Sequence, residues 1–138
     1  TRRIMKLYEA TGKEAPAKCD SYVTDIEHDT TKNTNFRKVL HTTKLSQLVL
    51  MSLKPGEDIG METHKHGDQF IRIDAGEGKV ILDGKEHDLK DGSAMVIAAG
   101  TEHNIINTSE TEELKLYAVY TPPEHKDGTI DKDKPDEH

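Results

Sequence analysis

The sequence predicts a single all-β domain, a sandwich or barrel, from three observations. The chain is 138 residues long, which suits one domain. After residue 40, short apolar runs alternate with turn-forming residues, and no segment keeps a 3.6-residue apolar period. Series of short strands without helices are typical of sandwiches and barrels. We expect the β domain at residues 41–121, an irregular N-terminal segment at residues 1–40 and a polar C-terminal extension at residues 122–138.

The expected strands are bounded by turn-forming residues. Residues 46–53 (SQLVLMSL) are apolar on both faces, which favours a central strand covered by other parts of the protein. Asp83-Gly84 divides residues 79–89 into a hairpin, because both positions of a two-residue turn favour positive φ. The other strands are expected at residues 60–64, 69–74, 94–98, 103–107 and 114–120.

The composition excludes several classes of function. The net charge is −7 and basic residues do not cluster beyond Arg2-Arg3, which argues against a nucleic-acid partner. No apolar run approaches the roughly 20 residues of a membrane helix, and the first residues do not resemble a secretory signal. Cys19 is the single cysteine, so an internal disulfide is impossible, and we expect a cytoplasmic protein.

The low apolar content predicts a thin core. Apolar residues make up 33% of the chain, and charged residues another 33%. A small β domain of this kind also has exposed strand edges. We therefore expect a homodimer, in which residues 1–40 pack on the domain or on the partner subunit.

Two spaced motifs carry the functional prediction. The first contains, with five, one, four and six intervening residues, Gly56, Glu62, His64, Gln69 and Gly76. The second contains, with seven, two and three intervening residues, Gly92, Gly100, His103 and Asn107.

Strand geometry brings four of these side chains to one cavity. Glu62 and His64 are two residues apart, so they point to the same face of a strand. Gln69 lies five residues beyond His64, and the turn at residues 65–68 must reset the alternation for it to face the same way. His103 arrives from the second motif. Carboxylate, imidazole and amide oxygen are competent metal ligands, and the mixed set suits one divalent ion, Zn, Fe, Mn, Co or Ni.

The two motifs together resemble those of the cupin superfamily. Glu62 stands where that family usually has histidine, Gln69 where it has glutamate, and Ala98 where it has proline, while every spacing is kept. The resemblance implies a jelly-roll fold and a metal held by Glu62, His64, Gln69 and His103. Pairing His64 with His66 instead would break the spacing of the first motif, and the alternative to any metal site is a metal-free cupin with core histidines.

A closer resemblance extends over about residues 33–130. Stretches such as DQFIRIDAGEGKVILDG, GTEHNIINTS and LKLYAVYTPPEHKDGT are similar to small single-domain cupins called mannose-6-phosphate isomerase-like. This implies a metal-dependent enzyme acting on a small oxygenated carbonyl or sugar-type substrate. The candidates for the acid–base role are His66, Tyr120 and a metal-bound hydroxide. Asn107 either orients the site or makes turn or strand-edge hydrogen bonds. Two alternatives are an Fe(II) dioxygenase and a cupin that binds a small molecule without chemistry.

Overall fold

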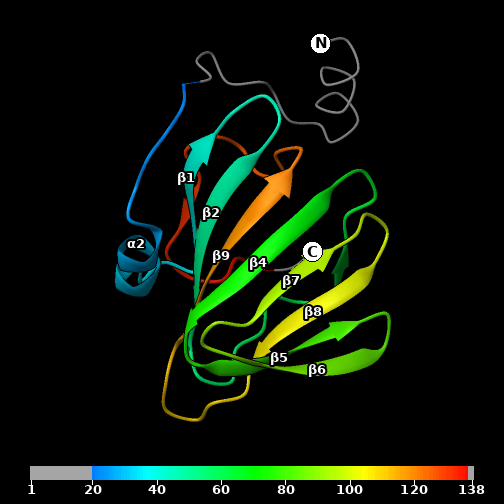
Figure 1. Cartoon of the computed structure of the whole chain (residues 1–138). Helices are drawn as coiled ribbons and strands as arrows, with labels where there is room; N and C mark the ends of the chain where they lie inside the picture. The colour runs from blue at the N-terminus through cyan, green and yellow to red at the C-terminus, as the bar shows by residue number, and fades with distance from the viewer. Residues whose placement is uncertain (1–19, 137–138) are drawn as a thin grey trace.

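The protein is a sandwich of two antiparallel β-sheets, as the sequence predicts. The computed structural model describes residues 20–136. The strands are β1 (Arg37–Thr42), β2 (Gln47–Leu53), β3 (Glu62–Thr63), β4 (Asp68–Ala75), β5 (Glu77–Leu82), β6 (Lys85–Lys90), β7 (Ala94–Ile97), β8 (Glu102–Asn107), β9 (Leu114–Thr121) and β10 (Ile130–Asp131). A six-stranded sheet has the order β10-β1-β2-β9-β4-β7 and a four-stranded sheet the order β3-β8-β5-β6 (Figure 1). Over the described residues the sheets do not close into a barrel, so the sandwich form of the prediction is correct and the barrel form is wrong.

The core lies between the two sheets, and the alternation of side chains builds it. In β9, every second side chain from Leu114 to Tyr120 is buried. Ile71 and Ile73 of β4 are fully buried on the same inner face. These residues pack against Ile105 of the four-stranded sheet in one hydrophobic cluster. The expected hairpin is confirmed, because Asp83 and Gly84 both have positive φ, 48° and 85°, between β5 and β6.

One helix, α2 (Ile26–Lys32), corrects the prediction of an irregular N-terminal segment. The Asp25 side chain caps it by accepting a hydrogen bond from the His28 amide. Thr30 is its buried residue, so the helix lacks the apolar period by which sequence patterns reveal helices.

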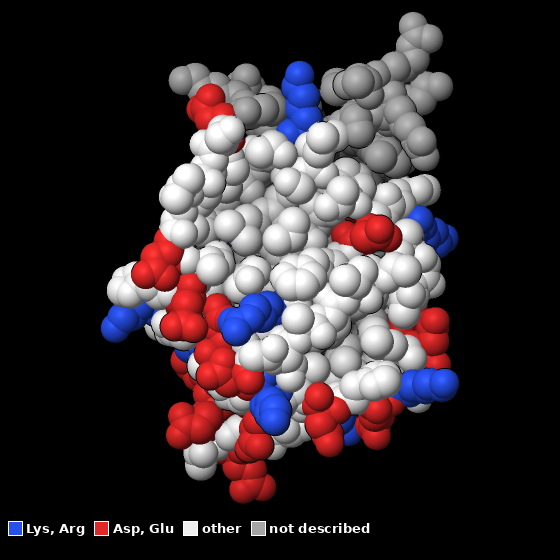
Figure 2. Space-filling model, viewed as in Figure 1, with Lys and Arg blue, Asp and Glu red and all other residues white. Residues whose placement is uncertain are grey.

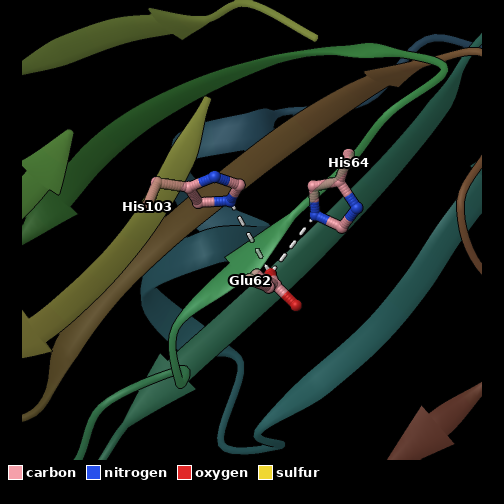
Figure 3. Close-up of side chains that lie close together, drawn as sticks. All are labelled: Glu62, His64 and His103. Carbon is pink, nitrogen blue, oxygen red and sulfur yellow. Dashed lines mark hydrogen bonds and ion pairs between the residues drawn. The ribbon is translucent and has the colours of Figure 1, made fainter. Parts of the chain in front are cut away.

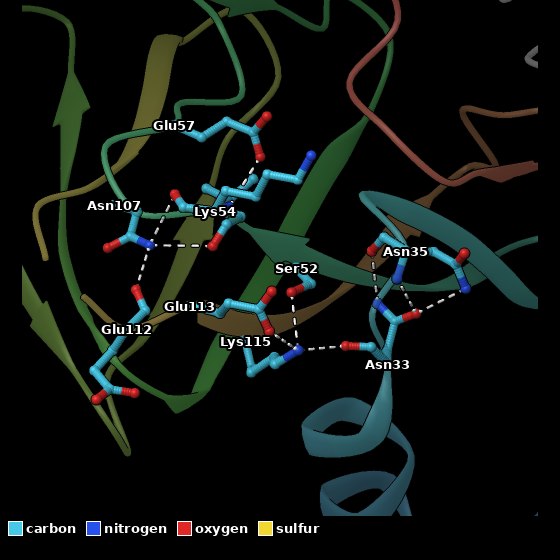
Figure 4. Close-up of polar contacts among 10 residues, drawn as sticks. Asn33, Asn35, Ser52, Lys54, Glu57, Asn107, Glu112, Glu113 and Lys115 are labelled. Carbon is cyan, nitrogen blue, oxygen red and sulfur yellow. Dashed lines mark hydrogen bonds and ion pairs between the residues drawn. The ribbon is translucent and has the colours of Figure 1, made fainter. Parts of the chain in front are cut away.

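A buried lysine fixes the end of α2 to the outer face of the six-stranded sheet. Lys115 of β9 is 8% exposed, and its Nζ donates to the Asn33 carbonyl at 2.5 Å and to Ser52 Oγ at 2.9 Å. Its Nζ also lies 2.7 Å from Glu113 Oε1 (Figure 4). A cation beside the last carbonyls of a helix is electrostatically favourable.

The six-stranded sheet extends beyond the expected boundaries of residues 41 and 121. It begins at Arg37, and the two-residue strand β10 pairs with β1 at its edge. An ion pair of 2.7 Å joins Arg37 to Asp131 in this pairing. Residues 122–136 are therefore not simply a solvated extension. Cys19 and residues 1–19 of the predicted N-terminal contact segment lie outside the described residues. No helix among residues 20–136 is long and apolar enough to cross a membrane.

Candidate metal centre

Three predicted ligands converge between the sheets. Glu62 lies in β3 directly opposite His103 of β8, and His64 follows one residue after β3 ends. Figure 3 shows the three side chains pointing toward one another. Each offers one ligand atom, and these atoms all lie within 4.8 Å of one another. The strand pairing therefore joins two motifs that are about forty residues apart in the sequence.

The separations of the donor atoms fit a single ion. Glu62 Oε1 lies 3.3 Å from His64 Nε2 and 3.8 Å from His103 Nε2. Ligands bound at about 2.1 Å in a tetrahedral or octahedral site are roughly 3.0–3.5 Å apart. The three donors are thus close to the spacing of a coordination shell, with space between them for a small rearrangement.

His103 is oriented as a ligand by its backbone contact. Its Nδ1 lies 2.9 Å from the Thr101 carbonyl, and a carbonyl only accepts, so Nδ1 carries the proton of the neutral ring. The lone pair is then on Nε2, which is buried without a hydrogen-bond partner. Metal-binding histidines typically donate their other ring N–H in this way. This unpartnered nitrogen supports a ligand role over that of a core histidine.

Gln69, the fourth predicted ligand, lies on the inner face of β4. Its side chain is 3% exposed and alternates with those of Ile71 and Ile73, so the turn after His64 resets the face as predicted. Its backbone pairs with Tyr120 of β9, whose ring lies 5.8 Å from the His64 ring. Gln69 Oε1 is buried without a hydrogen-bond partner, which an amide oxygen directed at a ligand would explain.

The site is negatively charged around His64. Burial opposes ionisation of Glu62, but the hydrogen bond that it accepts from His64 and its charge interaction with that ring outweigh this and lower the pKa of Glu62. Burial likewise opposes the charged form of His64. The hydrogen bonds that the ring donates to Glu124 and Glu62 prevail and raise the pKa of His64 to about 9. In the metal-free protein at neutral pH, the His64 ring is therefore protonated on both nitrogens, with Glu62 on one side and Glu124 on the other.

Tyr120 stays protonated in this environment. It is 4% exposed, and burial together with the Glu62 charge raises the pKa of its hydroxyl above the usual value of a tyrosine. The two tyrosines of β9, Tyr117 and Tyr120, point to opposite faces of the sheet, and Tyr120 is the inner one. A buried protonated phenol can donate a hydrogen bond or a proton, but it is a poor base at neutral pH.

The structure separates two other candidates from the cluster. His66 is exposed in the turn after His64 and lines a surface pocket with residues including Leu45, Asp68 and Pro122, so it is not one of the converging donors. The Asn107 side-chain amide donates to the carbonyls of Leu53, Lys54 and Glu112 (Figure 4). Its oxygen accepts from the Ser109 backbone amide. Of its two predicted roles, the structure shows the strand-edge hydrogen bonding.

Glu124 is a site residue that the sequence analysis missed. Its Oε1 lies 3.2 Å from His64 Nδ1, on the side of the ring away from Glu62. The residue follows β9 in the segment TPPEH, which was predicted to be a solvated extension. The motif spacings end before this segment, and only the presence of a carboxylate after the last expected strand could have drawn attention to it.

Comparison with known proteins agrees with this geometry. The family model of the Cupin domain matches residues 49–120. A protein of Acanthamoeba polyphaga mimivirus is 48% identical over 118 residues, which are 83% of this chain and 73% of that protein. A crystal structure from Bacillus halodurans superimposes with a TM-score of 0.81 at 38% identity, covering 86% of this chain and 94% of that chain.

A third comparison concerns a protein whose description includes an activity. A Thermotoga maritima protein, described as a predicted oxalate decarboxylase, is 30% identical with a TM-score of 0.53. The match covers 56% of this chain and 66% of that chain, just under two thirds of its length. Its similarity therefore extends over little more than half of this chain.

Proposed function

The chain belongs to the cupin family, and on that premise we propose that it binds one divalent transition-metal ion and acts on a small oxygenated carbonyl or sugar-type compound. Glu62, His64 and His103 would hold the ion, and Gln69 would be its fourth ligand. The observation that carries the proposal is the convergence of three donor atoms, from Glu62, His64 and His103. One of them, His103 Nε2, is buried without a hydrogen-bond partner, and so is Gln69 Oε1 on the inner face of β4. Leaving such groups unsatisfied costs about 1–3 kcal/mol each, which an ion would offset.

The chain's own residues supply binding and proton donation. A divalent ion in this set would act as a Lewis acid toward a carbonyl or hydroxyl oxygen. The Tyr120 hydroxyl, kept protonated by burial, would donate to a substrate oxygen beside His64. We assign no acid–base role to His66, because it is exposed outside the donor cluster.

Substrate class follows from the charge of the site and from the family resemblance. The donor set contains one carboxylate and two imidazoles, so a bound divalent ion keeps net positive charge and favours oxygen-rich, electron-rich ligands. Isomerisation of a sugar phosphate of the mannose 6-phosphate type is the specific reaction that the sequence resemblance supports. The Thermotoga maritima relative adds small carboxylates such as oxalate to the compounds worth testing.

The experiment has two stages. Metal analysis of protein purified without chelator should find about one divalent ion per chain, and His103→Ala should lose it. The loaded protein is then incubated with mannose 6-phosphate, oxalate and related compounds, with His103→Ala as the control. Wild-type protein without stoichiometric metal would refute the metal site. Wild-type turnover equal to that of His103→Ala would refute catalysis on these compounds and favour a protein that binds a metabolite without chemistry. Oxygen uptake by the wild-type protein would favour the dioxygenase alternative.

We also propose that the protein is a homodimer. The outer face of the six-stranded sheet carries Phe70 and the edge-strand residue Val96, which pair across β4 and β7 and are 36% and 70% exposed. The Tyr117 ring lies 6.3 Å from that of Phe70 on this face. Figure 2 shows a broad area without charged side chains, whereas acidic and basic groups gather toward the lower end of the molecule. Exposed apolar side chains such as Phe70 and Val96 favour association of subunits. A monomer in sedimentation would refute the proposal.

A further inference from the structure

The segment after β9 returns to the candidate metal centre and places a carboxylate against it. Pro122 and Pro123 are buried, and Glu124 Oε1 then lies 3.2 Å from His64 Nδ1. This carboxylate lies outside residues 49–120, the part of the chain that matches the Cupin domain. The Glu124 side chain is 31% exposed and that of His64 is 13% exposed, so the contact lies at the edge of the buried site.

The position of Glu124 is fixed by a buried glutamine on a central strand. Gln47 of β2 is 1% exposed, and its Oε1 accepts the backbone amides of both Glu124 and His125 at 3.2 and 2.9 Å. Its Nε2 donates to the His125 carbonyl at 2.7 Å and to Thr42 Oγ1 at 3.0 Å. One side chain thus satisfies three backbone groups of the segment, which ties Glu124 to the sheet.

A second contact fixes the same segment from the side of His64. A Cβ at Gly67 would lie 2.8 Å from the Thr121 carbonyl oxygen and 2.9 Å from Pro122 Cδ. The turn that follows His64 therefore packs backbone to backbone against the residues that precede Glu124. The two segments that carry the hydrogen-bonded pair are held together independently of that pair.

We infer that Glu124 is a positioning residue for the metal centre, which orients His64 by accepting the hydrogen bond of its Nδ1. With Nδ1 donating to Glu124, the Nε2 lone pair of the neutral ring points toward Glu62 and His103, where the other donors converge. Glu124 does not belong to the converging set itself. Carboxylates that orient ligating histidines also raise the basicity of the ligand, and their removal typically weakens metal binding 10- to 100-fold. The inference rests on the proposed metal binding and adds a residue that the motif spacings do not contain.

The test compares metal affinity in full-length variants. Glu124→Ala removes the acceptor, Glu124→Gln keeps a neutral acceptor of the same shape, and Glu110→Gln alters an exposed carboxylate in a loop away from the site. Calorimetric titration with Zn²⁺ and Mn²⁺ should show affinity 10- to 100-fold lower for Glu124→Ala, an intermediate loss for Glu124→Gln and no change for Glu110→Gln. Glu124 is partly exposed, so all three variants are expected to fold, which thermal unfolding of the metal-free proteins verifies.

A spectroscopic measurement separates orientation from general structural support. In the zinc-loaded wild-type protein, ¹⁵N spectra of the histidine rings should show His64 bound through Nε2 with a proton on Nδ1. Glu124→Ala should lose the hydrogen-bonded Nδ1 proton signal, whereas the His103 signals should be unchanged. Wild-type affinity in Glu124→Ala, or an unchanged His64 spectrum, would overturn the inference alone. Failure of the wild-type protein to bind either metal would overturn the proposed function and the inference with it.

Discussion

Metal binding should release one proton from His64, and its pH dependence can be worked out from the site. The two flanking carboxylates raise the pKa of His64 to about 9 in the metal-free protein. At pH 6–8 the ring is therefore almost fully protonated, and an ion must displace that proton to reach Nε2. Each pH unit below 9 then changes the apparent affinity about tenfold, so affinity should rise roughly 100-fold from pH 6 to pH 8 and level off near pH 9.

The assay is calorimetric titration with Mn²⁺ or Co²⁺ at several pH values, repeated in two buffers that differ in ionisation enthalpy. The buffer dependence gives the number of protons released, expected to be about one per ion at pH 7 for the wild-type protein. His64→Gln should bind more weakly and release correspondingly fewer protons. His87→Gln, which alters an exposed histidine of β6, is the matched control and should behave as wild type. An affinity that is flat between pH 6 and 8 would refute the reasoning, since His64 would then be uncharged or uninvolved.

The same shift has a consequence for the metal-free protein. A histidine with a raised pKa in the folded state stabilises that state fully below its unfolded value of 6.5 and loses this contribution as pH rises through about 9. The free energy of unfolding of metal-free protein should therefore fall between pH 7 and 9, and the fall should be smaller in His64→Gln. Denaturant unfolding at fixed ionic strength measures both.

Three further predictions concern packing and assembly. Lys115→Met leaves the Asn33 carbonyl and the Ser52 hydroxyl without their donor, so the free energy of unfolding should drop about 2–4 kcal/mol and Tm about 10 °C. Lys85→Met, on the exposed hairpin, is the control and should change Tm little. Equal Tm values for the two variants would contradict a stabilising role of the Lys115 contacts. Gly67→Ala forces the turn after His64 away from residues 121–122, so it should lower the free energy of unfolding by about 1–3 kcal/mol and weaken metal binding. Lys65→Ala in the same turn is the control. Unchanged stability and metal affinity in Gly67→Ala would show that the turn adapts to a Cβ at this position. Val96→Lys places a charge on the edge strand β7 and should give monomers in sedimentation. Thr63→Lys, on the other sheet, is the control and should leave the dimer intact. A dimer in Val96→Lys would place the interface elsewhere.

Much of the fold is readable from the sequence because its strands are regular. Residues 46–53 and 114–120 were expected as strands, and β2 and β9 occupy nearly these ranges. The donor cluster was predictable for the same reason, since a period of two fixes Glu62 beside His64 and the second motif supplies His103. Even the odd step to Gln69 was informative, because it required the turn that the structure contains.

What the sequence could not predict depends on contacts that leave no local pattern. Helix α2 is short and polar, and a lysine far along the chain holds it in place. Strand β10 is two residues long and is recognisable only through its pairing with β1. Glu124 reaches His64 because Gln47 binds its backbone from a strand 77 residues earlier. In the sequence, the Glu124 segment and the β10 segment are simply polar. Their roles become visible only through hydrogen bonds to residues far away in the chain.

Strand β10 protects one edge of the six-stranded sheet. Ile130 and Asp131 pair with β1 along the edge of the sheet. They occupy backbone hydrogen-bonding groups of β1 that could otherwise pair with a strand of a neighbouring molecule. A protein shortened to the end of β9 would keep the family's characteristic fold region and yet present β1 as a bare template for intermolecular pairing. Poor solubility of such a shortened protein would then reflect the exposed edge strand β1 and not a failure to form the hydrophobic core.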